Sequence, residues 1–288
     1  MAEIAAGMVM ELRKISGQGM MDCKQALSEA DGDMEKAIAI LRKKGLATLS
    51  RRAGRETTQG LVVSGISDDG RVAILASVCC ETDFVAKSDG FISVADKLVD
   101  YAMSCSAENG IDAVLKTELE GKKFDDIITE SVSKTGEKTQ IGDYAKFKLD
   151  GSGFIAIYIH FNKKVGTMVE FRTSDDSIAG SDVLRTIAND IAMHITAVKP
   201  LALDKSGIPA EEIEKEKAIY ADQVKNKPAN VQEKILEGKL RKFFADNCLL
   251  QQPFVKDDSK SVSEILAQAA KEAGGQADIK RFVRFEVG

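Results

Sequence analysis

The chain has 288 residues, of which 44% are hydrophobic and 30% are charged, a composition typical of a globular protein with a substantial core. Its net charge of −5 and its low aromatic content of 6%, with no Trp, disfavour DNA binding and a stacking platform for single strands. Five cysteines without a C-x-x-C pair, no long apolar run and no leader-like N-terminus predict a cytoplasmic protein with reduced thiols and no contact with a membrane.

Residues 1–54 predict a small helical domain followed by a linker. Apolar residues spaced for one face of a first helix are Ile4, Met8, Leu12 and Ile15. Asp22 and Asp33 are typical N-cap residues and predict two further short helices, the second of which Gly45 is expected to end. Three short helices in this length resemble a ubiquitin-associated domain.

Two segments of this region have alternative interpretations. Met20 and Met21 follow a helix break at residues 16–19 and serve either the core or a contact surface. Residues 46–59 are polar and basic, which suits contact with RNA. A solvated linker is the expected structure, because a few charges are weak evidence for a binding site.

Residues 55–142 predict a first α+β core subdomain. Strand-like segments at residues 61–63 and 72–78 flank a turn and predict a β-hairpin. Ser88 is expected to cap a helix that begins near Phe91, and a second helical stretch is expected around residues 111–119.

The junction between this hairpin and the helix carries the most informative residues of the chain. Residues 79–91 read Cys-Cys-Glu-Thr-Asp-Phe-Val-Ala-Lys-Ser-Asp-Gly-Phe. A Phe beside an Asp at such a junction can act as a wedge, whose ring enters an apolar pocket of a partner. The alternative is that Phe84 packs into the protein's own core, and residue chemistry alone favours this alternative because buried Phe is common.

Residues 143–288 predict a second α+β core subdomain with an inserted helical hairpin. Its antiparallel strands are expected at residues 146–149, 154–161, 165–171 and 282–287. Its helices are expected at residues 182–198, before Pro200, at 209–245 as a charged hairpin with a break near 226–230, and at 261–273. The predicted class is therefore α+β: a ubiquitin-associated-like three-helix domain, then two core subdomains with antiparallel sheets.

Motifs for direct nucleotide binding are incomplete. Residues 151–156 fit the pattern G-x-G-x-x-A, but a strand is expected after the glycines, where a phosphate site needs a helix N-terminus. Residues 136–139 read Gly-Glu-Lys-Thr, with a Glu between the Gly and the Lys of a phosphate loop. No direct nucleotide binding is expected.

Catalytic and metal-binding patterns are also missing from the sequence. His194 is expected to be a core histidine, whereas His160 ends a strand and suits a contact role. Cys79 and Cys80 are adjacent and should point to opposite faces of a strand. A thiol enzyme would need a histidine beside one of them, and only His160 is a candidate. We expect a protein that is not an enzyme and carries no metal or cofactor.

Five motifs in order along the chain resemble bacterial translation elongation factor Ts. They are residues 19–24 (Gly-Met-Met-Asp-Cys-Lys), 82–87 (Thr-Asp-Phe-Val-Ala-Lys), 191–194 (Ile-Ala-Met-His), 252–255 (Gln-Pro-Phe-Val) and 284–288 (Arg-Phe-Glu-Val-Gly). Cys79 departs from the pattern, since Asn is common there in the family. The resemblance covers nearly the whole chain.

The resemblance implies a guanine-nucleotide exchange factor that binds elongation factor Tu in its GDP-bound form and stays bound until GTP enters. It assigns the displacement of the partner's Mg²⁺ to Thr82, Asp83, Phe84 and Val85. It also assigns partner contacts to Leu12, Met20, Met21 and His160.

Two other hypotheses remain open. In one, the chain is an adaptor whose N-terminal helical domain binds a ubiquitin-like or nascent-chain partner, so that residues 1–45 alone would bind and Phe84 would not matter. In the other, it is a thiol-dependent enzyme that loses activity when Cys79 or Cys80 is replaced by Ser.

Overall fold

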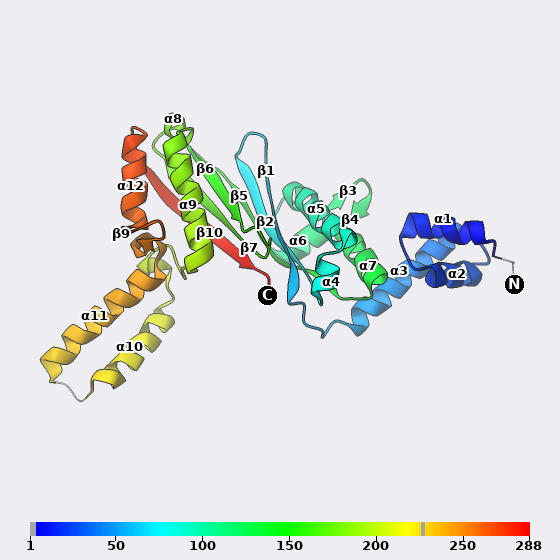
Figure 1. Ribbon diagram of the computed structural model, residues 1–288, viewed down its shortest axis with the longest axis horizontal. Helices are drawn as coiled ribbons and strands as arrows, with labels where there is room; N and C mark the ends of the chain where they lie inside the picture. The colour runs from blue at the N-terminus through cyan, green and yellow to red at the C-terminus, as the bar shows by residue number, and fades with distance from the viewer. Residues whose placement is uncertain (1–3, 226–227) are drawn as a thin grey trace.

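Two three-stranded antiparallel sheets pack face to face in the middle of the computed structural model, which describes residues 4–225 and 228–288 (Figure 1). The first sheet has the order β1-β2-β5 and consists of β1 (Gln59–Ile66), β2 (Val72–Cys80) and β5 (Thr139–Lys148). The second has the order β10-β7-β6 and consists of β6 (Gly153–Ile159), β7 (Val165–Thr173) and β10 (Ala277–Glu286). Side chains such as Leu75, Phe147, Ile155 and Met168 fill the space between them. The predicted α+β class with antiparallel sheets is confirmed.

Helices cover the outer face of each sheet, which gives four layers. The first sheet packs against α5 (Asp89–Ser104), α6 (Ile111–Lys116) and α7 (Phe124–Thr135), beside a small hairpin of β3 (Glu118–Leu119) and β4 (Lys122–Lys123). The second packs against α8 (Asp176–Ala179), α9 (Asp182–Val198) and α12 (Val262–Glu272). Ser88 caps α5 as expected, because its hydroxyl accepts a hydrogen bond from the Phe91 N–H. Helix α7 was not predicted.

Strand β5 corrects the predicted division between the two sheets. Residues 146–149 were expected in the second sheet, but β5 pairs with β2 along its length, with Leu75 opposite Ala145. The predicted boundary between residues 142 and 143 therefore falls inside one strand. Strand β2 is buried on both faces and reads as one long apolar segment, so its sequence does not indicate which strand pairs with it.

The N-terminal module consists of α1 (Ala6–Ser16), α2 (Met20–Glu29) and the first part of α3 (Met34–Arg51). Asp33 caps α3 as predicted, since its side chain accepts a hydrogen bond from the Lys36 N–H. The prediction for Asp22 is wrong: the N-cap of α2 is Gly19, three residues earlier, and Asp22 lies in the first turn of the helix. A carboxylate there still interacts favourably with the helix dipole.

The predicted end of α3 at Gly45 and the linker at residues 46–59 are also corrected. Helix α3 continues to Arg51 and lies across α7. A Cβ atom at Gly45 would lie 2.9 Å from the carbonyl oxygen of Thr129 in α7. Gly45 is therefore present because the two helices approach closely, and a continuous helix joins the module to the core.

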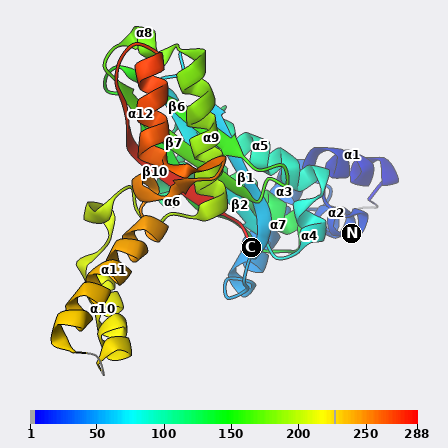
Figure 2. The same ribbon diagram turned by 60° about the vertical axis from the view of Figure 1, so that its left-hand side comes forward.

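A helical hairpin projects from the opposite end of the molecule, as Figures 1 and 2 show. It consists of α10 (Ala210–Val224) and α11 (Ala229–Asn247), close to the predicted segment. Of the break expected near residues 226–230, residues 226–227 lie outside the described residues. Ile208, Phe243, Phe244 and Cys248 pack at its base, where the chain continues through η1 (Lys205–Gly207), η2 (Leu249–Gln251), β8 (Pro253–Phe254) and β9 (Asp257–Ser261).

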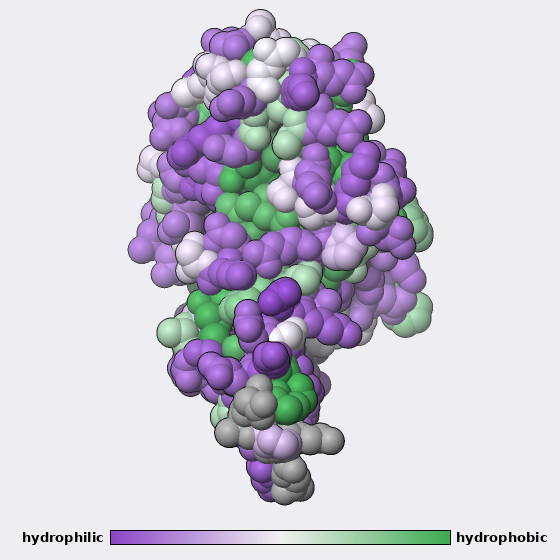
Figure 3. All heavy atoms as spheres, turned by 90° about the vertical axis from the view of Figure 1, so that its left-hand side faces the viewer, coloured by the Kyte–Doolittle hydropathy of each residue, from purple (hydrophilic) through white to green (hydrophobic). Residues whose placement is uncertain are grey.

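The face that carries this hairpin is largely hydrophilic, and its hydrophobic areas are small and separated by polar side chains (Figure 3). None of the helices in the described part of the chain has the length and apolar character needed to cross a membrane.

Candidate functional site: an exposed aromatic wedge after β2

Phe84 lies on α4 (Asp83–Ala86), a single helical turn that begins three residues after the end of β2. Thr82 is the N-cap of this turn, and its hydroxyl accepts a hydrogen bond from the Val85 N–H. Val85 and Ala86 face the core of the first subdomain, so the Phe84 ring points away from it and is 83% exposed. The alternative in which Phe84 packs into the core is wrong.

Two glutamates hold the backbone that leads into α4. The Thr82 N–H donates to Glu137 Oε2 at 3.0 Å, and the Thr82 hydroxyl donates to Glu137 Oε1 at 2.7 Å. In return, the Lys138 N–H donates to Glu81 Oε1 at 2.7 Å. Arg52 donates through Nη1 to both carboxylate oxygens of Glu81, at 2.7 and 2.8 Å. The loop therefore has a fixed backbone although its aromatic side chain is exposed.

Asp83 places a negative charge next to the exposed ring. Its carboxylate accepts a hydrogen bond from Lys87 Nζ at 2.7 Å. This hydrogen bond is the main reason that the pKa of Asp83 lies below its ordinary value. Asp83 is therefore ionised at neutral pH, and both members of the ion pair face solvent.

A groove of about 620 Å³ runs beside the wedge and is bordered on its other side by the turn between β6 and β7. Thr82, Asp83 and Phe84 line it together with Asn162 and Lys164. The turn is tied to β1, because the Val62 N–H donates to the carbonyl of Lys163 and Lys164 Nζ donates to Gln59. The structure thus brings the predicted wedge and the turn that follows His160 to one groove.

This turn carries a second exposed aromatic residue, Phe161, which was not predicted. Phe161 is 88% exposed, and its ring lies 4.4 Å from that of His160. His160 is half-buried, with Nδ1 3.2 Å from the Tyr158 hydroxyl. The available signal was an aromatic residue directly before Asn-Lys-Lys, a polar turn in which an apolar side chain gains no burial.

The N-terminal residues assigned to partner contact divide into two groups. Met20 is 43% exposed and Met21 is 75% exposed at the start of α2, so these methionines form part of the surface. Leu12 is fully buried in the core of the module, so its assignment as a contact residue is corrected. In Figure 1, α1 and α2 lie beyond α7 from α4, so these methionines and Phe84 are separate parts of the surface.

The thiols are poorly suited to nucleophilic chemistry. Cys79 and Cys80 are buried on opposite faces of the first sheet, as expected. Burial, with a smaller effect from Asp143, raises the pKa of Cys79 to about 11. Burial, with the nearby Glu137 carboxylate, raises the pKa of Cys80 to about 12. Both thiols are therefore protonated at neutral pH, and a thiolate is the nucleophilic form.

His194 is a core histidine, as predicted. It is fully buried on α9, its Nε2 lies 2.9 Å from Gln252 Oε1, and its Nδ1 accepts a hydrogen bond from the Val255 N–H at 3.2 Å. Burial lowers the pKa of His194, so the ring is neutral at neutral pH. In residues 4–225 and 228–288, no group of three or more His, Cys, Asp or Glu side chains could hold a metal ion.

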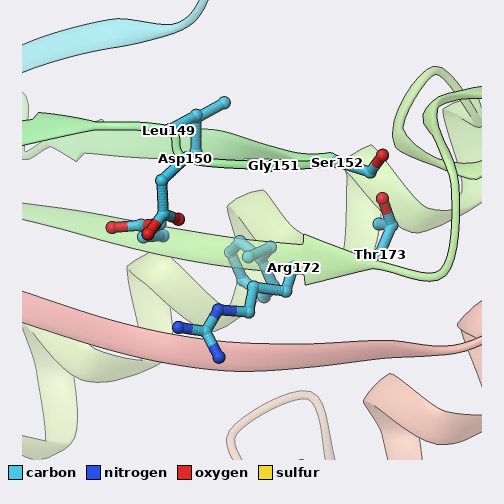
Figure 4. Close-up of a pocket in the computed structure, with 8 residues that line it drawn as sticks. Leu149, Asp150, Gly151, Ser152, Arg172 and Thr173 are labelled. Carbon is cyan, nitrogen blue, oxygen red and sulfur yellow. The ribbon is translucent and has the colours of Figure 1, made fainter.

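Gly151, the first glycine of the G-x-G-x-x-A pattern, borders a different cavity, of about 380 Å³, shown in Figure 4. Strand β6 begins at Gly153, so a strand and not a helix follows the glycines, and the expected strand is confirmed. Asp150 extends from the same turn and pairs with Lys280 at 2.9 Å. Charges of both signs border this cavity, since Glu170 and Arg172 also line it, so its lining does not select for a phosphate group.

Comparison with known proteins places these features in a family. The family model described as Elongation factor TS matches residues 81–288. Elongation factor Ts from a Nitratiruptor species is 42% identical over 99% of this chain and 93% of its own length. Elongation factor Ts from Trichlorobacter lovleyi and from Clostridium perfringens are each 38% identical, again over 99% of this chain and 93% of their own lengths.

Proposed function

The chain belongs to the elongation factor Ts family of translation elongation factors, and on that premise we propose that it is a guanine-nucleotide exchange factor for elongation factor Tu. It binds the GDP-bound partner, promotes the release of GDP by disturbing the Mg²⁺ and phosphate site, and stays bound until GTP enters. It works in the cytoplasm and makes or breaks no covalent bond, so it is not an enzyme and needs no cofactor of its own.

The observation that carries this proposal is the exposed Phe84 on a fixed backbone. A ring that is 83% exposed in the free protein has most of its apolar surface still available for burial. Enclosing a phenyl side chain in an apolar pocket contributes roughly 1.5–3 kcal/mol. That free energy offsets the movement of partner elements that surround the nucleotide, and buried aromatic anchors of this kind dominate interface energetics.

The second part of the mechanism concerns Asp83 and the Mg²⁺ ion of the partner. In P-loop GTPases, Mg²⁺ bridges phosphate oxygens and a protein hydroxyl in strict octahedral geometry. Small displacements of its surroundings are therefore costly. The ionised Asp83 carboxylate would enter beside this site with Phe84, while Thr82 and Val85 hold the turn that presents both residues.

Thermodynamic linkage makes this process a cycle. If binding of the factor weakens the partner's affinity for nucleotide, nucleotide weakens the affinity of the factor by the same ratio. Entry of GTP therefore expels the factor.

Further contacts of the proposed interface come from other parts of the chain. Met20 and Met21 suit an irregular apolar surface, because Met side chains are flexible. His160 would contact the partner from the turn beside the groove. Leu12 would stabilise the module from within its core. We propose that this module is a ubiquitin-associated-like domain.

The adaptor hypothesis has less support. It requires a module that binds without the core, but α3 runs from the module onto α7, and an ion pair links Arg42 to Asp126 there. It also leaves the exposed Phe84 without a role.

The direct test uses catalytic amounts of the protein with elongation factor Tu loaded with fluorescent GDP. An exchange factor at a tenth of the partner concentration should release all the label in the presence of excess GTP, by repeated cycles. Stoichiometric release limited to a tenth of the label, or no acceleration, would contradict the proposal. Residues 1–45 alone should release none.

A further inference from the structure

We propose that Glu137 and Glu81 are positioning residues that aim Phe84 at the partner, by forming a reciprocal clasp between residues 81–82 and 137–138. This inference rests on the proposed exchange function and identifies the residues that preorganise its wedge. Neither glutamate touches the nucleotide in this proposal, because both act through Thr82.

The clasp continues the first sheet beyond the end of its backbone ladder. Pairing between β2 and β5 ends at Cys80 opposite Thr139. Beyond that pair, side chains replace the missing backbone partners: one residue further, Glu81 accepts from the Lys138 N–H, and two residues further, Glu137 accepts from the Thr82 N–H. Each dipeptide thus supplies one carboxylate and one N–H, and each carboxylate accepts from the N–H of the residue directly opposite it.

Glu137 also sets the direction of the Thr82 hydroxyl. The hydroxyl donates its proton to Glu137 Oε1 at 2.7 Å, which leaves a lone pair to accept the Val85 N–H at 3.3 Å. This second bond is the N-cap of α4. Loss of the Glu137 carboxylate frees the hydroxyl to rotate and weakens the cap.

Helix α4 needs this support because it is a single turn. Forming one isolated helical turn is unfavourable, since it fixes several backbone dihedrals for one hydrogen bond. The exposed Phe84 ring adds almost no packing of its own, and Ala86 is the one buried residue of the turn. The orientation of Phe84 therefore depends on the backbone at its N-terminal side, where the clasp lies.

The clasp also connects the wedge to the helix that carries the N-terminal module. Arg52, the C-cap of α3, binds Glu81. Lys138 Nζ donates to the carbonyl oxygens of Ala53 and Arg55, at 2.8 and 3.0 Å. Burial raises the pKa of Glu81, but the hydrogen bonds from the Lys138 N–H and the Arg52 guanidinium outweigh it and hold this pKa below its ordinary value. The Glu81 carboxylate is therefore charged.

The test is a double-mutant cycle between Glu137→Ala and Phe84→Ala, measured as GDP release from the partner at saturating concentrations of the factor. Glu137→Ala alone should slow release roughly tenfold, which corresponds to about 1.4 kcal/mol. Glu137→Gln should have an intermediate effect, because its carbonyl oxygen accepts from the Thr82 hydroxyl while its amino group faces the Thr82 N–H. The matched control is Glu130→Ala on the neighbouring α7. It removes an exposed ion pair between Glu130 and Lys122 and should leave the rate unchanged.

The cycle separates positioning from general stabilisation. If Glu137 acts through the wedge, adding Glu137→Ala to Phe84→Ala should slow release less than about twofold further, because coupled residues are not additive. Hydrogen exchange of the free protein gives a readout without the partner: the Thr82 and Val85 amides should exchange faster in Glu137→Ala, while the β2 amides stay protected.

Three outcomes would overturn the inference. Full multiplication of the two effects would show that Glu137 acts independently of Phe84. Wild-type release rates in Glu137→Ala would show that the clasp is not needed for exchange, with the proposed function intact. If the wild-type factor itself fails to accelerate release, the proposed function fails and the clasp loses its role in exchange, even if the amide exchange changes as expected.

Discussion

Replacement of Gly45 by Ala should destabilise α3, although the same change normally stabilises a helix. Ala is favoured over Gly in a helix interior by roughly 1 kcal/mol. At position 45 the new Cβ would lie 2.9 Å from the Thr129 carbonyl oxygen and 2.9 Å from Ser133 Cβ. A backbone oxygen cannot rotate away, so α3 and α7 must separate, and overpacking of this kind costs roughly 1–3 kcal/mol. The net expectation is a loss of about 0–2 kcal/mol.

Gly238 in α11 provides the matched control, because a Cβ there meets nothing within 4 Å. The gain from helix propensity is common to both variants, so their difference isolates the clash at roughly 1–3 kcal/mol. Native-state hydrogen exchange measures the local opening free energy of each helix. It should fall or stay level in α3 for Gly45→Ala and rise in α11 for Gly238→Ala. Equal stabilisation of both helices would refute the close packing of α3 on α7.

Three further predictions concern single residues. Burial lowers the pKa of His194, so the unfolded chain binds a proton at higher pH than the folded chain. The contribution of His194 to the free energy of unfolding should therefore be complete above pH 6.5 and decline as the pH falls below it. Urea midpoints measured from pH 7.5 to 5.5 should depend less on pH in His194→Asn than in the wild type. Phe161→Ala should leave the urea midpoint unchanged, because the ring is exposed. If the ring is an interface anchor worth more than about 1 kcal/mol, the variant should slow GDP release at least roughly fivefold. An unchanged release rate would exclude that role. Met21→Ser should raise the concentration of factor needed for half-maximal release more than it lowers the maximal rate, and the opposite pattern would remove α2 from the initial contact.

Local signals in the sequence were sufficient for many elements. Ser88 and Asp33 act as caps because each side chain accepts a hydrogen bond from the backbone N–H three residues later, which is a local property. The alternation of residues 282–287 correctly predicts a strand in the second sheet, since one of its faces packs between the sheets. His194 was predicted to be buried from its position on the apolar face of α9.

Contacts between distant segments explain most of the errors. Gly45 is a suitable helix stop in isolation, and only the approach of α7 shows that it lies within a longer helix. Residues 146–149 alternate like any antiparallel strand, and nothing local shows that they pair with β2.

The candidate site shows the same division between local and distant information. Residues 82–85 were predicted as a unit, but the exposure of Phe84 depends on which residues of the turn face the core. Glu137 lies 55 residues from Thr82 in the sequence, so its bonds to the wedge were not predictable from local pattern. Phe161 had a local signal, its place directly before a polar turn, but its exposure is known only from the structure.

The most direct test of the wedge compares wild type with Phe84→Ala in stopped-flow release of fluorescent GDP from elongation factor Tu, at saturating factor, with Ile66→Ala as a control for loss of an exposed apolar side chain elsewhere. Phe84→Ala should keep the wild-type urea midpoint, since the ring is 83% exposed, and Ile66→Ala, which removes a half-exposed side chain, should lower it only slightly. Phe84→Ala should slow the accelerated release roughly 10- to 150-fold, the equivalent of about 1.5–3 kcal/mol, while Ile66→Ala should match wild type. Equal acceleration by wild type and a folded Phe84→Ala variant would show that the exposed ring does not drive exchange.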